Sequence, residues 1–163
     1  MTEDRKACLD GLRALRGKGD RTRTIACYQQ ALAINPKEPL YYHLLHHEYR
    51  MKLAYSQALK VIRKGLVQAG DDPLLLSDLA ELQIVKGELD QAAATLDRCE
   101  ALPEGKEKGG TCWIRARLAE AGHDYPAAIE YYDQAGALAK DASMKDVAAA
   151  NKKRLQAMLK AGK

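Results

Sequence analysis

The sequence has no phenylalanine, one tryptophan and five prolines in 163 residues, and it has no long uninterrupted apolar run. Its apolar stretches, such as residues 74–76 (LLL) and 92–94 (AAA), fall far short of the roughly 20 residues that a bilayer-spanning helix needs. The start, MTEDRKACLD, has acidic residues and no apolar run behind its basic residues, so we expect no secretory signal. These absences favour a cytoplasmic protein. At roughly 100 to 200 residues per domain, we predict a single domain over residues 1–163.

The motifs of common catalytic sites are also missing. The sequence contains no G-x-x-x-x-G-K-[ST], G-x-G-x-x-G, G-x-S-x-G or H-E-x-x-H. We therefore expect no enzyme, no catalytic residue and no cofactor. The four cysteines, Cys8, Cys27, Cys99 and Cys112, are far apart and form no C-x-x-C pair, so we predict reduced thiols that act as small buried residues.

What the chain does contain is a repeat. Strong helix formers dominate its composition, no segment alternates apolar and polar residues for long, and the chain is predicted to be all-helical. Similar segments begin 34, 34 and 36 residues apart, at Thr24, Ala58, Ala92 and Ala128. A small residue follows seven positions later in each copy, at Ala31, Gly65, Cys99 and Ala135. Breaks precede the copies at Gly19, Leu53, Gly87 and Gly122.

The period and the residue types resemble the tetratricopeptide repeat (TPR), a helical hairpin of 34 residues. The second copy carries the clearest motif, with Tyr42, Leu45 and Tyr49 on its first helix and Ala58 and Ile62 on its second. The resemblance spans about residues 5 to 138. It implies an all-α, right-handed α-solenoid of stacked helix-turn-helix hairpins with a C-terminal capping helix. We expect repeats at about 5–38, 39–72, 73–104 and 110–140, and the capping helix at about 141–161.

Several local expectations follow from this register. Small residues such as Ala58 and Ala92 should lie at the helix crossings, where larger side chains do not fit. Tyr28, Tyr42, Tyr49 and Tyr132 should pack between helices, whereas Tyr41 and Tyr131 should be freer for contacts. His46 stands where the family has a small residue, so it should pack between helices. The loop at 103–110 should be flexible. The last helix should begin at Asp141 or Ser143 and lay one apolar stripe on the stack: Met144, Val147, Ala148, Leu155, Met158 and Leu159.

TPR domains typically bind an extended peptide or a helix in a concave groove lined by the first helix of each hairpin. The resemblance implies these groove residues: Lys6, Leu9, Arg13, Arg16, Leu40, His43, His47, Arg50, Met51, Leu74, Ser77, Glu81, Ile84 and Val85. In the fourth copy Arg115 or Arg117 is the candidate. The subfamily that clamps a C-terminal carboxylate uses Lys and Asn, but Leu44, Leu74 and Asp78 stand at the corresponding places here. Binding of the Hsp70 or Hsp90 tail is therefore not expected.

The densest group of functional residue types is HLLHHEYR, which contains His43, His46 and His47. His43 and His47 are four residues apart, so they share a helix face and could hold zinc or copper with two ligands. A stable site usually needs three or four ligands, and we predict no metal site and assign His43 and His47 to the groove. A two-ligand metal site and ordinary packed or solvated histidines are the alternatives.

Charge is sorted along the chain. Residues 1–70 have a net charge of +7, residues 71–138 of −8 and residues 139–163 of +5. The basic residues form no tract with interleaved aromatics, so we do not expect nucleic-acid binding. We predict a non-catalytic interaction module, an adaptor, scaffold or assembly factor, whose groove binds a possibly acidic peptide or helix of a partner protein. The alternatives are a self-associating structural protein and a small secretion-type chaperone.

Overall fold

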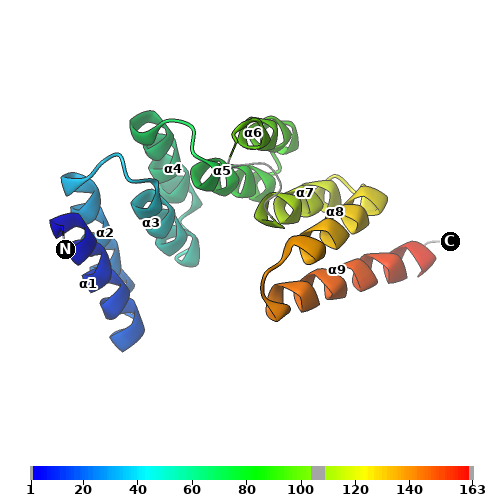
Figure 1. The fold of residues 1–163 in the computed structure, drawn as a ribbon, viewed down its shortest axis with the longest axis horizontal. Coiled ribbons are helices and arrows are strands. Elements are labelled where there is room, and N and C mark those ends of the chain that lie inside the picture. Colours follow the sequence, from blue (N-terminus) through cyan, green and yellow to red (C-terminus); the bar gives the residue numbers. More distant parts are fainter. Residues whose placement is uncertain (1, 104–108, 162–163) are drawn as a thin grey trace. The chain divides into compact units, whose positions relative to one another are not determined.

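The computed structural model describes residues 2–103 and 109–161, and within these ranges it contains helices and no strands (Figure 1). In chain order the helices are α1 (Glu3–Lys18), α2 (Arg21–Ile34), α3 (Pro39–Met51), α4 (Tyr55–Ala69), α5 (Pro73–Lys86), α6 (Leu89–Ala101), α7 (Gly109–Ala121), α8 (Tyr125–Leu138) and α9 (Ala142–Ala161). No helix in the described ranges is long and apolar enough to cross a bilayer. The prediction of an all-α fold is confirmed.

Each predicted repeat contains one pair of helices, and aspartates at helix starts fix several of the boundaries. The carboxylate of Asp20 accepts a hydrogen bond from the Arg23 backbone N–H at the start of α2, at 3.0 Å. Asp124 does the same for Ala127 at the start of α8, at 3.1 Å. These carboxylates satisfy backbone donors that have no partner inside the helix, and an N-cap of this kind stabilises a helix by about 1 kcal/mol.

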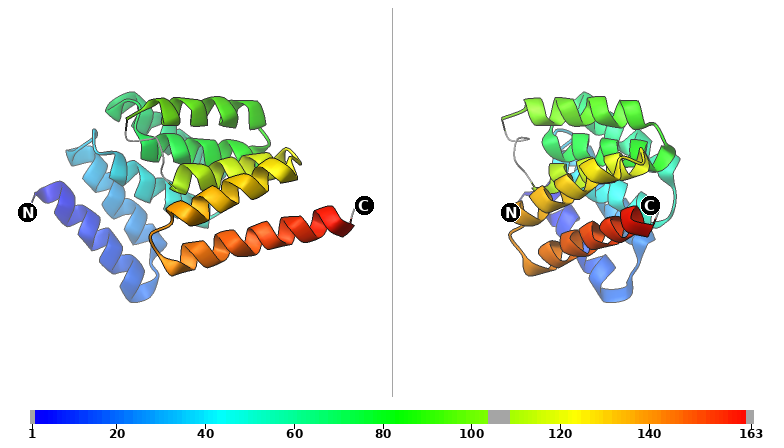
Figure 2. Two further views of the ribbon diagram at one scale, coloured as in Figure 1. Left: turned by 45° about the vertical axis from the view of Figure 1, so that its right-hand side comes forward. Right: turned by 90° about the vertical axis from the view of Figure 1, so that its right-hand side faces the viewer.

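The chain forms two compact units, Met1–Leu79 and Ala80–Lys163, and the boundary falls inside α5. In the first unit, α1 lies beside α2 and α2 beside α3, which pairs with α4 (Figures 1 and 2). Its core includes an apolar cluster contributed by α1, α2 and α3: Ala7, Cys8, Ile25, Tyr28, Ala31, Tyr41 and Leu45.

The second unit is built from the rest of α5 and helices α6 to α9. Ala80, Leu96 and Ile114 form a cluster that joins α5, α6 and α7. Further along the chain, α7, α8 and α9 lie side by side (Figure 2) and bury Ala116, Ala128, Tyr132 and Leu155. The Trp113 ring meets the Tyr132 ring edge-on, with centroids 5.1 Å apart, which is a favourable arrangement for an aromatic pair.

Small residues occupy the closest helix contacts, as the repeat predicts. Ala58, Ala92 and Cys99 are completely buried. Gly65 on α4 faces the Tyr42 ring on α3, and a Cβ atom added at Gly65 would stand 2.8 Å from that ring. No larger side chain fits there without displacing Tyr42, so the small residue lets α3 and α4 approach each other.

The last helix, α9, starts where predicted but packs through a narrower face. Asp141 caps it by accepting a hydrogen bond from the Met144 backbone N–H at 2.7 Å. Of the predicted apolar stripe, Ala148 and Leu155 are buried and Leu159 is half-buried, whereas Met144, Val147 and Met158 are exposed. Part of the predicted apolar stripe is therefore left uncovered on this helix. A helix that packs on one side covers a strip that can be narrower than its whole apolar face.

The surroundings of Tyr41 differ from the sequence expectation. Tyr41 is buried, and its hydroxyl donates a hydrogen bond to the Asp4 carboxylate at 3.0 Å. The expectation that Tyr41 is freer for contacts with a partner is therefore wrong. The same carboxylate accepts a hydrogen bond from the side chain of Asn35 at 3.2 Å. Hydrogen bonds from Thr2, Asn35 and Tyr41 hold the pKa of Asp4 well below its usual range. Most of the predicted flexible loop at 103–110, residues 104–108, lies outside the described residues.

The turn inside each hairpin uses a left-handed backbone residue. Gly19, Leu53 and Gly87, at three of the predicted breaks, have φ values of 64°, 56° and 76°. In the fourth hairpin the left-handed residue is His123, with φ 63°, and not the predicted Gly122. The spacing from Gly87 to His123 is therefore 36 residues, the same as from Ala92 to Ala128. The extra residues of the fourth copy thus lie before the turn.

Leu53 is strained at this turn and offers a test of the register. A left-handed conformation costs an L residue roughly 1 to 2 kcal/mol and costs glycine very little. The Leu53 side chain is mostly exposed, so it contributes little burial. We expect Leu53→Gly to raise the free energy of unfolding by about 1 kcal/mol, measured by urea denaturation. The reverse change at an equivalent turn, Gly87→Ala, should lower it by a similar amount. Equal unfolding midpoints for both variants and the parent chain would contradict this account of the turns.

Candidate functional site

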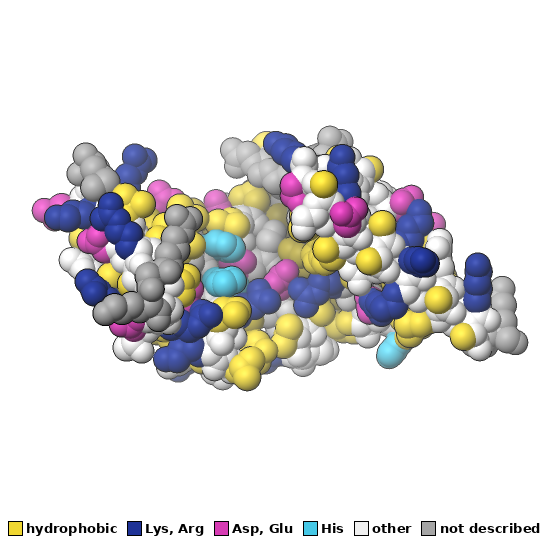
Figure 3. All heavy atoms as spheres, turned by 90° about the horizontal axis from the view of Figure 1, so that it is seen from below, with side chains coloured by type: hydrophobic (Ala, Val, Ile, Leu, Met, Phe, Trp, Pro, Cys, Tyr) yellow, Lys and Arg dark blue, Asp and Glu magenta, His cyan; other side chains and the backbone are white. Residues whose placement is uncertain are grey.

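The predicted groove residues of the first unit gather on the α3 face, which consists of Leu40, His43, His47 and Met51. These residues follow a spacing of three or four, so they share one side of the helix. Leu40 and Met51, and Leu74 at the start of α5, are between 37% and 53% exposed. Apolar side chains thus stand beside imidazoles on an accessible surface. Figure 3 shows histidine side chains next to one another on the surface, with hydrophobic and basic side chains around them.

The other predicted residues of this unit with described side chains are exposed or half-buried. Arg13 on α1 is 75% exposed and pairs with Asp10 one turn earlier, at 3.2 Å. Lys6 and Leu9 are exposed on the same helix, and Arg50 and Ser77 are half-buried. The side chain of Arg16 lies outside the described part of the chain.

In the second unit the predicted residues other than Val85 contact neighbouring helices. Glu81 on α5 pairs with Arg117 on α7 at 3.1 Å, and Ile84 packs against the cluster of Ala80, Leu96 and Ile114. Val85 is exposed. The sequence candidate Arg115 forms hydrogen bonds through two of its nitrogens with both carboxylate oxygens of Glu100 on α6, at 3.0 and 2.9 Å. Such a two-pronged ion pair fixes α7 against α6, so the structure gives Arg115 a packing role.

The three histidines of α3 lie in different surroundings. His46 is 1% exposed, which confirms that it packs between helices. The side chain of His43 is 31% exposed and that of His47 is 54% exposed. Nδ1 of His47 lies 3.8 Å from a carboxylate oxygen of the buried Glu48. His47 is therefore a surface residue, while His43 and His46 face toward α5.

Asp78 on α5 joins His43 and His46. Its Oδ2 atom lies 2.8 Å from Nδ1 of His43, a hydrogen-bond distance, and 3.4 Å from Nδ1 of His46. Burial raises the pKa of this carboxyl, but the two neighbouring imidazoles outweigh that effect and hold the pKa below its ordinary value. The carboxylate is thus ionised at neutral pH. One nitrogen from each histidine and one oxygen of Asp78 all lie within 4.8 Å of one another.

His46 is incompletely satisfied in this cluster. Within the described part of the chain, neither of its ring nitrogens has a hydrogen-bond partner, although both are buried. A buried polar atom without a partner costs about 1 to 3 kcal/mol. Sequence reasoning paired His43 with His47 and did not include Asp78. The available signal in the sequence was an acidic residue, Asp78, on the predicted first helix of the next repeat, 35 positions after His43 and so about one repeat length away.

The fold is shared with solved structures over nearly the whole chain. MamA from Desulfovibrio magneticus RS-1 superposes with a TM-score of 0.65 at 11% identity, covering 99% of this chain and 98% of that one. A tetratricopeptide repeat protein from Parabacteroides merdae gives 0.64 at 18% identity, covering 94% of this chain and 60% of that one. The thermophilic TPR protein TTC0263 from Thermus thermophilus gives 0.54 at 17% identity, covering 91% and 98%.

The chain has the tetratricopeptide-repeat fold. The resemblance inferred from the 34-residue period is therefore confirmed in three dimensions. No protein-family model matches the sequence, and no curated protein matches it. At these identities, the likeness to other TPR structures shows the fold alone.

Proposed function

We propose that this TPR chain is a non-catalytic interaction module of the cytoplasm, which binds a peptide or helix of a partner protein on the first helices of its hairpins. The TPR fold supports the proposal, and so does the absence of common catalytic motifs from the sequence. The observation that carries it is the α3 face. There, Leu40 and Met51 are exposed beside His43 and His47, which offers apolar contact area together with polar groups that can fix an orientation.

The charge of the surrounding helices favours an acidic or amphipathic segment as the ligand. Residues 1–70 carry a net charge of +7, which includes Arg50 on α3 itself and the exposed Arg13 on α1. Basic groups at the rim of an interface speed the encounter with an acidic partner and discriminate against basic ones. The proposed partner is thus a protein segment with acidic residues around a few apolar anchors.

Reversal of two charges tests this assignment. The double variant Arg13→Glu, Arg50→Glu should reduce the capture of partner proteins from cell extract by roughly tenfold, since the two reversed rim charges together cost on the order of 1.4 kcal/mol. Captured proteins are identified and quantified by mass spectrometry.

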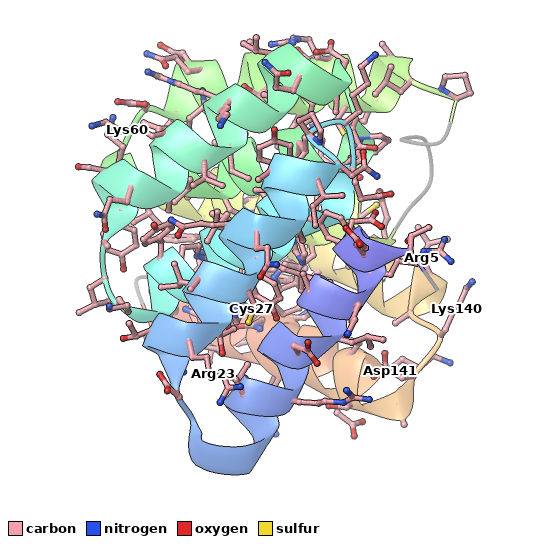
Figure 4. All side chains as sticks on the ribbon, turned by 90° about the vertical axis from the view of Figure 1, so that its left-hand side faces the viewer. Arg5, Arg23, Cys27, Lys60, Lys140 and Asp141 are labelled. Atoms are coloured by element: carbon pink, nitrogen blue, oxygen red, sulfur yellow. The ribbon has the colours of Figure 1, made fainter. Side chains whose placement is uncertain are left out.

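The matched control changes the same number of charges on α4, the second helix of a hairpin. Lys60 and Arg63 are exposed there, and Figure 4 marks Lys60 at the edge of the molecule. Lys60→Glu, Arg63→Glu should leave capture within twofold of the parent chain. Equal losses in the two double variants would indicate a general charge effect and would contradict binding at the α3 face.

Self-association is the second candidate function, and one observation on α9 favours it. Met144, Val147 and Met158 remain exposed on this helix, together with Leu138 at the end of α8. A second copy could cover these side chains. Light scattering at several protein and salt concentrations decides the matter, because a constant monomer mass excludes this function.

A further inference from the structure

The strongest unexplained feature of the molecule is a buried imidazole that has no partner for either nitrogen within the described residues. His46 lies three residues after His43 on α3, so both side chains stand on the same side of the helix. Asp78 approaches both of them from α5, within the same compact unit. A hydrogen bond between His43 and Asp78 accounts for that pair, but it leaves His46 with its buried nitrogens unsatisfied.

We propose that His43, His46 and Asp78 form a binding site for a zinc ion, a site that does not depend on the proposed partner binding. The expectation of no metal site rested on the two ligands His43 and His47, whereas the structure puts His46 in the place of His47 and adds Asp78 as a third ligand. Two imidazoles and one carboxylate are a common ligand set for zinc with a position open to water. A metal bond to His46 would give a partner to one of its two buried ring nitrogens, neither of which has a hydrogen bond within the described residues.

The two distances from Asp78 to the histidines are close to those that zinc requires. The two histidine nitrogens lie within 4.8 Å of each other, so zinc binding requires them to approach by up to about 1.5 Å. Zn–N and Zn–O bonds of about 2.0 to 2.2 Å in a tetrahedron place the ligand atoms about 3.3 Å apart. His46 Nδ1 and Asp78 Oδ2 are already 3.4 Å apart. His43 Nδ1 and the same oxygen are 2.8 Å apart, so that pair must separate by about 0.5 Å. Small rotations of the half-exposed His43 side chain can supply this shift.

Charge and protonation also fit a cation. A carboxylate oxygen and a neutral imidazole nitrogen each present a lone pair to a metal. When zinc binds, a ring proton that points toward Asp78 is transferred to the other ring nitrogen or to solvent, and the metal takes its place. His43 is 31% exposed, so a water molecule can reach the fourth coordination position. Imidazole nitrogens favour zinc, copper or nickel over magnesium or calcium.

Zinc titration of the full chain tests the proposal. Isothermal titration with zinc chloride at about pH 7.5, where imidazoles are mostly neutral, should show one ion per chain. The affinity should fall at least tenfold in His43→Ala and in Asp78→Asn. His47→Ala is the matched control, because His47 is the neighbouring exposed histidine and lies outside the cluster. Its zinc affinity should stay within twofold of the parent chain.

One spectroscopic measurement and one thermal measurement distinguish this site from a zinc site elsewhere in the chain, for example one formed by cysteine. Cobalt substituted for zinc should give the visible absorption of a tetrahedral site with nitrogen and oxygen ligands, without a thiolate charge-transfer band. Free zinc at about 100 times the dissociation constant should raise the melting temperature by roughly 5 to 10 °C in the parent chain and in His47→Ala. The two ligand variants should show no such rise.

Any one of three results would overturn the proposal. The first is a parent chain that binds no zinc. The second is binding that survives in both His43→Ala and Asp78→Asn while circular dichroism shows both variants to be folded. Loss of binding in His47→Ala with retention in Asp78→Asn would likewise overturn it and would assign the metal to the pair His43 and His47.

Discussion

Replacing Ala92 by tyrosine should lower the free energy of unfolding by about 1 to 3 kcal/mol. Ala92 is completely buried on α6, at the position where the repeat places a small residue in every copy. A tyrosine there must push the paired helices apart or adopt a strained rotamer, because a close-packed interior has no void for the ring. Ala58→Leu, at the same position of the second hairpin, should act in the same way. Urea denaturation followed by circular dichroism measures the effect.

The same helix provides the control. Ala94 lies two positions after Ala92 on α6 and is exposed, so its replacement changes composition and helix propensity by the same amount without overpacking. Ala94→Tyr should shift the free energy of unfolding by less than about 0.5 kcal/mol, as most surface substitutions do. An Ala92→Tyr variant as stable as Ala94→Tyr would show that the repeat register proposed for the third hairpin is wrong.

Removing the guanidinium of Arg21 should destabilise the first unit by about 2 kcal/mol. Nη1 of Arg21, in the first turn of α2, lies 2.8 Å from Oε2 of Glu48 on α3, and the side chain of Glu48 is 3% exposed. Arg21→Met keeps much of the apolar stem but leaves a buried carboxylate without this partner. Breaking a buried pair in this way costs about 3 to 5 kcal/mol, and the 34% exposure of Arg21 reduces that figure because water can partly replace it.

A double-mutant cycle isolates the ion pair from other effects. Arg21→Met combined with Glu48→Gln should be less destabilised than the sum of the two single variants, because the second change removes the charge that the first leaves unpaired. Arg23→Met is the control, since Arg23 is exposed two positions along the same helix (Figure 4). Additive single effects would show that the contact contributes nothing to stability.

The helical hairpins could be predicted from the sequence because a period of 34 residues repeats several constraints at once. Ala58 and Ala92 predict the helix crossings. A residue in the left-handed conformation is expected five positions before each of them, at Leu53 and Gly87, where the chain reverses between the two helices of a hairpin. This reasoning holds within one hairpin, where distances along the chain determine which residues meet. It was one residue in error at the fourth turn, where His123 and not Gly122 has the positive φ.

Contacts between hairpins were less predictable. The sequence indicates that His43 and His47 share a helix face. It does not indicate which side chain on the first helix of the following hairpin contacts the histidines of α3. The structure brings Asp78 to His43 and His46 across 35 and 32 positions. Similarly, Tyr41 is buried because Asp4, 37 positions earlier, accepts its hydroxyl proton in a hydrogen bond. Such pairs depend on side-chain length and rotamer, which a repeat pattern does not specify.

The position of the boundary between the two compact units determines how the chain can be shortened. The boundary falls within α5, after Leu79, and not in the loop that precedes this helix. A fragment ending at Gly70 would contain four whole helices, yet it would lose Leu75, which lies against Gly65, and Asp78, which contacts His43. A truncation intended to isolate the first two hairpins should therefore extend to Lys86, the end of α5, so that the contacts of Leu75 and Asp78 with these hairpins are kept.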